Sequence, residues 1–178
     1  MTSWKVGCWG GGALAIALSV VQTKRSEKAV WGFDTFEGHP KPSPDEFDVW
    51  GNNQLERFIE LKGQGADWCK VSLEDVQQNV AAVCGSIDGL KLVKGKAEET
   101  LPTHFPERVS IIRCDVDWYE PSMATFEALY PRLSSGGIVI VDDYGHHSGS
   151  KKAVDEYFGE LHPKFTHIDY SCITFVKP

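Results

Sequence analysis

The sequence predicts an α/β fold built on a mostly parallel sheet, because short apolar runs alternate with amphipathic helical segments along its 178 residues. A glycine-rich turn follows the first apolar run, and one or two aspartates follow three of the other runs. These positions matter, because ligands of open α/β sheets bind at the carboxyl ends of the strands. We therefore expect one domain over residues 1–178, with its functional site at that edge of the sheet.

The central stretch begins with a short strand and continues into a helix. The apolar run 109–112 is followed closely by Asp115 and Asp117. A helix is expected to begin beside Pro121, since proline suits the first helical position and the acid before it suits the positive end of the helix dipole. The serines and glycines of residues 134–137 should end this helix.

A second strand, expected over residues 138–141, follows that helix and ends in Asp142 and Asp143. Its continuous apolar run is typical of a strand covered on both faces. Because one helix joins the two strands, they should be parallel, and their carboxylates should emerge at the same edge. Converging carboxylates repel one another unless a cation lies between them, and Mg²⁺ prefers oxygen ligands of this kind. Two acidic clusters therefore predict a magnesium site, whereas a single cluster would be typical of an ordinary loop.

The N-terminal part has the pattern of a cofactor site. A strand over residues 4–9 runs into three glycines and an apolar helix that continues to about Val21, and such a turn lets a cofactor approach the backbone at a helix N-terminus. A second strand over residues 28–33 ends in Asp34, which is placed to accept hydrogen bonds from ribose hydroxyls. The chain lacks a G-x-G-x-x-G spacing and a Walker lysine-serine pair, so NAD and ATP are not indicated.

The remaining elements follow from the same patterns. The proline-rich stretch 38–70 is expected to be a lid or insert, with one helix around residues 54–61 and with Trp50 and Trp68 as candidates for a substrate pocket. Elsewhere we expect a helix over residues 73–83, a strand over 90–93, a short helix within 95–102, a helix from its cap Ser150 to Leu161, and two strands within 165–176.

The composition narrows the classes of partner. A net charge of −7 argues against nucleic acid or an anionic membrane surface as the main partner. The five cysteines are odd in number and widely spaced, which indicates free thiols in a cytoplasmic protein and argues against a zinc site. Lys5 and the apolar run 13–21 have some features of a secretory signal, but glycines separate them and no small-residue cleavage site follows.

A set of motifs is spread over nearly the whole chain: VGCWGGGALAIAL, VWGFDTFEGHPKP, KGKAEETLP and, above all, DVDWYEP…LYPRLSSGGIVIVDDYG followed by KKAVDEYF. Together they resemble the macrocin O-methyltransferase family, whose members use S-adenosylmethionine to methylate sugar hydroxyls on antibiotics. The resemblance implies a Rossmann-like methyltransferase fold, with a mostly parallel seven-stranded sheet and an antiparallel last strand. It also implies Mg²⁺ held by Asp115, Asp142 and Asp143, with Asp115 as general base and Asp34 on the cofactor ribose.

This expected activity agrees with the chemistry of the residues. A sugar hydroxyl has a very high pKa, so it needs both a cation and a carboxylate base before it can act as a nucleophile. The expected acceptor is a small molecule with a sugar hydroxyl or a phenol. The expected cofactor-binding residues are Gly7, Cys8, Trp9, Gly11, Asp34, Thr35, Lys96 and Ala97.

Two features depart from the family pattern. Lys5 stands where family members usually have an acid, and few residues precede the first strand. The expectations they leave open are an incomplete cofactor pocket, a lid supplied by another subunit of a homo-oligomer, and a fragment. Two other functions also stay open, a catalytically inactive cofactor-binding module and a D-x-D glycosyltransferase. His146 and His147 are candidates for substrate contact, although a solvated loop is the ordinary place for such residues.

Overall fold

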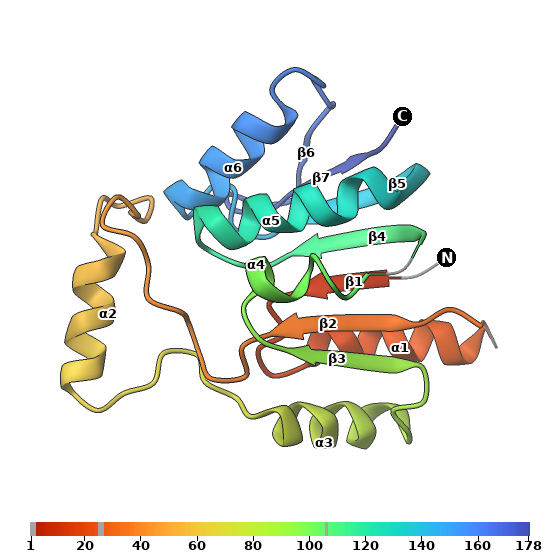
Figure 1. Ribbon diagram of the computed structural model, residues 1–178. Helices are drawn as coiled ribbons and strands as arrows, with labels where there is room; N and C mark the ends of the chain where they lie inside the picture. Colours follow the sequence, from red (N-terminus) through yellow and green to blue (C-terminus); the bar gives the residue numbers. More distant parts are fainter. Residues whose placement is uncertain (1–2, 25–26, 106) are drawn as a thin grey trace.

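The computed structural model describes residues 3–24, 27–105 and 107–178, and its strands form a seven-stranded sheet in the order β3-β2-β1-β4-β5-β7-β6 (Figure 1). The first five strands along the chain are parallel, and the last two pair antiparallel. This confirms the predicted α/β class and the antiparallel last strand. The strands are β1 (Ser3–Val6), β2 (Val30–Asp34), β3 (Leu90–Lys94), β4 (Val109–Cys114), β5 (Leu133–Val141), β6 (Thr166–His167) and β7 (Ile173–Val176).

Helices cover the two faces of the sheet unequally. Helices α1 (Gly12–Thr23) and α3 (Leu73–Cys84) pack together on one face, while α5 (Tyr119–Leu129), α6 (Ser148–Phe158) and the short α4 (Ala97–Thr100) lie on the other. Helix α2 (Gln54–Gly63) lies apart from both layers, beyond the carboxyl ends of the strands (Figure 1). The stretch predicted to be a lid or insert therefore lies at the edge where the site was expected.

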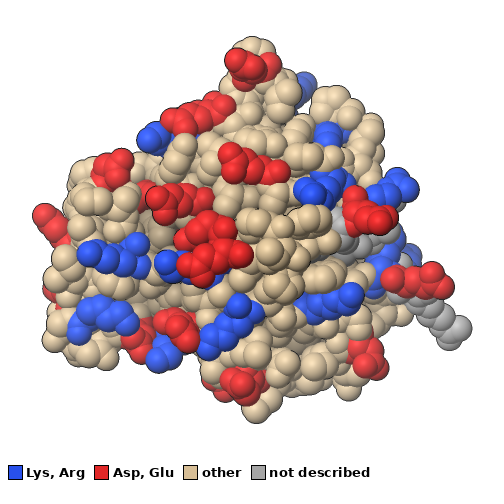
Figure 2. All heavy atoms as spheres, viewed as in Figure 1, with Lys and Arg blue, Asp and Glu red and all other residues tan. Residues whose placement is uncertain are grey.

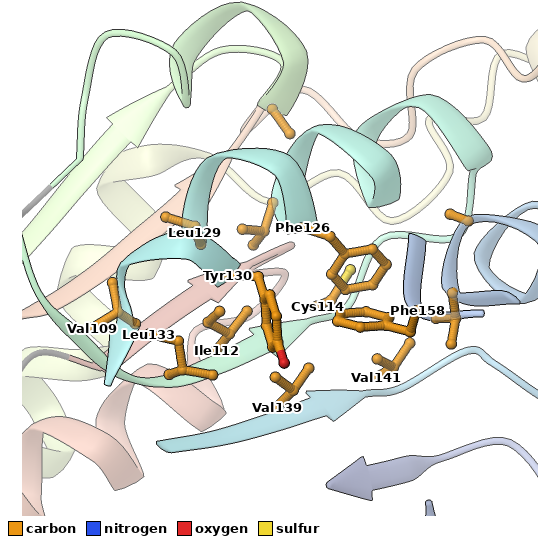
Figure 3. Close-up of a cluster of buried hydrophobic side chains, with 14 of the residues drawn as sticks. Val109, Ile112, Cys114, Phe126, Leu129, Tyr130, Leu133, Val139, Val141 and Phe158 are labelled. Atoms are coloured by element: carbon orange, nitrogen blue, oxygen red, sulfur yellow. The ribbon is translucent and has the colours of Figure 1, made fainter. Parts of the chain in front are cut away.

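The larger core cluster lies between β4, β5 and helices α5 and α6 (Figure 3). Phe126 is its central ring, fully buried, with its centroid 5.0 Å from that of Phe158 and 5.9 Å from that of Tyr157. A smaller cluster joins α1 and α3 to the sheet through Leu14 and Leu18. The apolar run 13–21 is thus the core-facing helix that follows the glycine turn.

Replacing Phe126 by alanine is expected to lower the free energy of unfolding by about 3–5 kcal/mol, because the cavity would be enclosed by rigid neighbours. Urea denaturation followed by circular dichroism measures this change. Val83→Ala is the control, since Val83 on α3 is 69% exposed and should change stability by less than about 0.5 kcal/mol. Equal midpoints for the two variants would contradict the packing described for α5.

Strand β5 differs from the prediction at its beginning. Residues 134–137 were expected to end the preceding helix, with the strand over 138–141, but the strand starts at Leu133. The register shifts between Val109 and Ile111 on the neighbouring strand. The extra residues form a bulge, in which Gly136 takes a φ of 75° and donates its N–H to the carbonyl of Lys177. The prediction of cover on both faces was wrong at Ile138, which is exposed, whereas Val139 is buried.

Helix α6 begins earlier and ends earlier than predicted. Its N-cap is His147, and the predicted cap Ser150 lies within the helix and is fully buried. The first turn is held instead by Ser148, whose N–H donates to the carbonyl of Phe47 at 2.8 Å. Leu161 lies beyond the end of the helix and is exposed. These shifts have a tertiary cause, because residues of the distant 38–70 stretch replace the local cap.

Acidic and basic side chains are interspersed on the face shown in Figure 2. All five cysteines are free. None of the helices in the described ranges is both long enough and apolar enough to cross a membrane.

Candidate functional site

The loops that follow β1, β2, β4 and β5 meet around a cleft of about 810 Å³ at the carboxyl edge of the sheet. Backbone hydrogen bonds continue beyond the strands and hold these loops together: Asp115 N–H donates to Val6 at 2.9 Å, and Asp142 N–H donates to Cys114 at 2.9 Å. The predicted site residues that line the cleft are Gly7, Cys8, Trp9, Asp34, Thr35, Lys96, Ala97, Asp115, Asp142 and Asp143.

Asp34 organises the turn after β1. Its Oδ2 accepts the N–H groups of Cys8 and Trp9, the latter at 3.2 Å, and its Oδ1 accepts that of Phe36 at 2.8 Å. Gly7 makes this turn possible, because it has a φ of 83° and a Cβ there would collide with the carbonyl oxygen of Asp115. The aspartate at the end of the second strand thus shapes the turn that was predicted to receive the cofactor.

Two details of the N-terminal prediction differ in the structure. Strand β1 ends at Val6 rather than Trp9, because the chain turns at Gly7. Gly11 does not line the cleft: it caps α1 with a φ of 85°, and its Cβ position lies 3.2 Å from side-chain atoms of Val76 and Val80 on α3. Gly11 therefore permits close packing of two helices.

The structure brings Asp115, Asp142 and Asp143 together, with one carboxylate oxygen of each within 4.8 Å of the others. Two basic side chains already contact this cluster. The Lys5 ammonium donates to Asp115 Oδ2, and Lys5 is only 6% exposed. Arg113 contacts Asp142 Oδ1 at 2.8 Å and Asp115 Oδ2 at 3.4 Å. Two of the three predicted metal ligands therefore have cationic partners within the protein.

Asp143 and Asp117 form the other half of the cluster. Burial, together with repulsion from neighbouring carboxylates, raises the pKa of both side chains above the ordinary range of aspartate. Asp117 Oδ2 lies 3.3 Å from Nε2 of His147 and 3.5 Å from Nε2 of His39. Burial lowers the pKa of His147 to about 4, so this imidazole is neutral near pH 7. Carboxylate oxygens are ligands that a divalent cation prefers, and a cation among them would offset the repulsion between these side chains.

His147 does not lie in a solvated loop, as the sequence pattern had suggested. It is buried, with 7% of its surface exposed, and its ring centroid lies 5.3 Å from that of Trp118. Only its neighbour His146 is partly exposed, and Trp50 packs edge-on against His146 with 5.1 Å between their centroids. The sequence could not distinguish these two histidines, because residues far away in the sequence contact both of them, through Trp50 at His146 and through a backbone bridge from Asp48 to His147, and bury only His147.

Aromatic rings form one wall of the cleft. Trp68 from the insert lies 4.8 Å from His39 and 5.9 Å from Trp118, measured between ring centroids. Trp118 is held by a hydrogen bond from Nε1 to the carbonyl of Pro40 at 3.1 Å. Of the two tryptophans suggested by the sequence, Trp68 lines the cleft, whereas Trp50 is 71% exposed. Trp118 was not predicted, although its place directly after Asp117 was a usable signal.

Glu46 fastens the insert to the rest of the domain. Its side chain is buried and accepts the N–H of Tyr119, in the first turn of α5, at 2.8 Å. Next to it, Phe47 N–H donates to Ser148 Oγ at 2.8 Å, at the start of α6. A carboxylate at a helix N-terminus also interacts favourably with the helix dipole. The insert is therefore anchored where the two helices begin.

Glu46→Ala is expected to destabilise the domain by about 1–3 kcal/mol, because it leaves the partly buried Tyr119 N–H without its acceptor. The loss should be greatest locally, so amide hydrogen exchange over residues 44–53 should become faster than in the sheet. Asp45→Ala is the matched control, since Asp45 is exposed and accepts a hydrogen bond from its near neighbour Ser43. Unchanged exchange in Glu46→Ala would show that the insert is held by other contacts.

Comparisons with known proteins agree with this geometry. The profile of the Macrocin-O-methyltransferase (TylF) family matches residues 4–177. The Mycinamicin III 3''-O-methyltransferase of Micromonospora griseorubida is 32% identical over 154 residues, which is 86% of this chain and 58% of that protein. The 8-demethyl-8-(2,3-dimethoxy-alpha-L-rhamnosyl)-tetracenomycin-C 4'-O-methyltransferase of Streptomyces olivaceus is 33% identical over 156 residues, which is 87% of this chain and 57% of that protein.

A solved structure of another protein has a similar fold. The O-methyltransferase NovP superposes with a TM-score of 0.84 at 28% sequence identity, covering 99% of this chain and 71% of that one. The chain thus spans somewhat more than half the length of the curated relatives it matches. With the family profile matched from residue 4 to residue 177, the chain belongs to the macrocin O-methyltransferase family.

Proposed function

We propose that this protein transfers a methyl group from S-adenosylmethionine to a hydroxyl group of a small molecule. The observation that carries the proposal is one continuous cleft, which joins the turn organised by Asp34 to the carboxylate cluster around Asp143. A cofactor at the turn and an acceptor at the carboxylates would face each other across this cleft. The chain also belongs to an O-methyltransferase family, which supports the same reaction.

The donor half of the cleft has the features that a nucleoside cofactor requires. Asp34 offers carboxylate oxygens for ribose hydroxyls, and Gly7, Cys8 and Trp9 present backbone close to the cofactor. Lys96 and Ala97 begin α4 at the same edge, where their backbone can support the flat base. The proposed donor site comprises these residues together with Thr35, which also lines the cleft.

The acceptor half of the cleft contains the carboxylates proposed to deprotonate a hydroxyl group of the substrate. Asp115, Asp142 and Asp143 are the proposed ligands of a divalent cation, expected from the resemblance to be Mg²⁺. When bound, such a cation lowers the pKa of a hydroxyl held next to it. Asp115 is the proposed general base and would accept the hydroxyl proton. The rings of Trp68 and Trp118 exclude water on the other side and offer flat surfaces to a sugar or a phenol.

The names of the relatives favour a sugar on a natural product as the acceptor of this protein. The name of the Streptomyces olivaceus relative specifies a rhamnosyl group on tetracenomycin and methylation at a 4' hydroxyl. A cytoplasmic location belongs to the same proposal and is supported by the five free thiols.

Titration of the purified protein with S-adenosylhomocysteine, followed by calorimetry, tests the donor half directly. We expect saturable one-to-one binding, and no comparable heat with a uridine diphosphate sugar. Binding of the sugar nucleotide, without binding of S-adenosylhomocysteine, would overturn the proposal in favour of a D-x-D glycosyltransferase.

A catalytically inactive cofactor-binding module is the second candidate, favoured by the ion pair between Lys5 and Asp115. In that case the Lys5 ammonium would keep Asp115, the proposed base, from accepting a proton from the substrate. A panel of glycosylated and phenolic acceptors, assayed with labelled S-adenosylmethionine, distinguishes the two. Transfer to any acceptor supports the enzyme, while cofactor binding without any transfer supports the module.

A further inference from the structure

Three aromatic rings from distant parts of the chain meet at the rim of the cleft. Trp50 from the insert and Tyr170 from the loop between β6 and β7 both pack edge-on against His146, with 5.1 Å and 5.9 Å between ring centroids. The Tyr170 hydroxyl and His146 Nδ1 are also hydrogen-bonded, at 3.3 Å. Trp50 is 71% exposed and Tyr170 is 68% exposed. We call these three residues the rim platform.

The turn that carries Trp50 is organised by a buried carboxylate. Asp48 Oδ1 accepts the N–H of Trp50 at 3.0 Å and that of Asn52 at 2.9 Å, while Oδ2 accepts the side-chain amide of Asn52 at 2.8 Å. Asp48 is buried, and its backbone forms a bridge with His147, next to the start of α6 (Figure 1). The backbone of this exposed tryptophan is therefore fixed to the rest of the domain.

The loop that carries Tyr170 is fixed in a similar way. Gly145 N–H donates to the carbonyl of Ser171 at 2.8 Å, and Ser171 Oγ donates to the carbonyl of Asp142 at 2.7 Å. Gly145 is required here, because a Cβ at this position would collide with the carbonyl oxygen of Tyr170. Both exposed rings of the rim platform thus stand on backbone that is held against the site, although their faces are open to solvent.

The rim platform continues the cleft outward on its carboxylate side. His146 lines the cleft, and its N–H donates to the carbonyl of Asp143 at 3.1 Å. Trp50 and Tyr170 extend the same surface beyond His146. A ligand whose hydroxyl lies at the carboxylates would therefore leave the cleft over these rings, if it is larger than the space beside Asp143.

We propose that the rim platform is a binding subsite for the apolar aglycone of the acceptor, while the hydroxyl to be methylated lies in the cleft. Exposed tryptophan and tyrosine rings that form one surface are typical of binding sites, since they offer a large rigid apolar area at a low cost in conformational entropy. The inference deepens the proposed methyl transfer and rests on it. It also gives Trp50 a role in acceptor binding outside the cleft.

The charges around the rim platform favour an apolar occupant over a diphosphate. None of the cation–ring contacts among the described residues involves one of its three rings. Asp169, next to Tyr170, is an exposed carboxylate that would repel an anionic ligand. Phosphate groups are usually bound by arginine, lysine or a helix N-terminus. A neutral ring system therefore suits this surface better than the diphosphate of a sugar nucleotide.

Pairs of glycosides that share a sugar test the subsite without any assay of activity. Calorimetry compares the rhamnoside and the glucoside of 4-methylumbelliferone, which carry a flat aglycone, with methyl rhamnoside and methyl glucoside, which carry none. We expect the wild type to bind at least one umbelliferyl glycoside about tenfold or more tightly than its methyl counterpart. Trp50→Ala and Tyr170→Ala should each reduce this preference about fivefold, because each removes one ring of the platform.

Conservative variants and a matched control separate ring contact from other effects. Trp50→Phe and Tyr170→Phe each keep an aromatic ring and should keep most of the preference. Ile16→Ala is the control, since Ile16 on α1 is also 71% exposed but does not belong to the platform, and it should bind as the wild type does. Thermal unfolding shows whether each variant is folded.

Four results would overturn the inference. The first is equal affinity of the wild type for the umbelliferyl and methyl glycosides, and the second is no binding of either. The third is a preference that survives both alanine variants. The fourth is loss of a dimer in Trp50→Ala, measured by light scattering, with the preference unchanged, which would assign the surface to a second copy of the chain. Binding of uridine diphosphate glucose that weakens in Trp50→Ala would assign it to a nucleotide and overturn the inference as well.

Titration with S-adenosylhomocysteine in the same preparations reports on the proposed function separately. The alanine variants should bind it as the wild type does, because the rim platform adjoins the carboxylate side of the cleft and not the turn organised by Asp34. Failure of the glycoside comparison with intact binding of S-adenosylhomocysteine would leave the proposed function standing. No binding of S-adenosylhomocysteine by the wild type would count against the proposed function itself.

Discussion

Asp143→Asn is expected to lower kcat/KM for methyl transfer by about a thousandfold or more, with binding of S-adenosylhomocysteine retained. Two groups of three side chains have ligand atoms close enough to hold a metal ion, Asp115, Asp142 and Asp143 in one and Asp117, Asp143 and His147 in the other. Asp143 belongs to both groups, so its loss weakens a cation site at either. A cation that stabilises a developing alkoxide contributes several kcal/mol, and each 1.36 kcal/mol corresponds to a factor of ten in rate. Single-turnover assays with labelled S-adenosylmethionine measure the effect.

The asparagine keeps the size of the side chain and replaces one carboxylate oxygen by an amide group. Thermal unfolding of the variant shows whether it is folded. Asp88→Asn, in an exposed turn before β3, is the matched control and should transfer methyl groups at the wild-type rate. A fully active Asp143→Asn would show that the reaction needs no cation at this cluster.

Asp34→Ala should weaken binding of S-adenosylhomocysteine by about a hundredfold or more. The substitution removes the carboxylate proposed for the ribose, and it also releases the N–H groups of Cys8 and Trp9 that shape the turn. Hydrogen bonds to a charged group contribute about 1.5–3 kcal/mol each, and about 2.7 kcal/mol corresponds to a hundredfold change in affinity. Calorimetry provides the dissociation constants.

Asp88→Ala serves as the control for this variant, because it removes an exposed aspartate that lies before β3, at the end of the sheet opposite to the cleft. If Asp34→Ala bound the cofactor normally, the glycine turn would have to be held by other groups, and the ribose contact would be excluded.

The prediction was most successful for residues whose place in the fold follows from their position along a strand. Asp115 and Asp142 follow β4 and β5, and a single helix between two strands makes them parallel. Their meeting at one edge therefore follows from local pattern and connection rules alone. The turn after β1 and Asp34 after β2 were predicted on the same basis.

It was less successful where a distant segment replaces a local signal. Ser150 has the residue type of a helix cap, yet Ser148 and Phe47 hold the beginning of α6. The serine and glycine run 134–137 has the composition of a loop, yet pairing with the last strand draws it into β5. Such partners cannot be read from neighbouring residues.

By itself, the sequence determined the α/β class, the family, and the edge at which carboxylates and glycine turn meet, because these depend on patterns within short segments. Only the tertiary structure decided how the charges of the site are compensated. Lys5 and Asp115 are 110 positions apart, and their contact needs β1 and β4 side by side. The burial of His147 likewise needs the insert to fold over α6. Whether a carboxylate has a cationic partner depends on distances between residues that are far apart in the sequence. Those distances cannot be read from composition or from the spacing of residues along the chain.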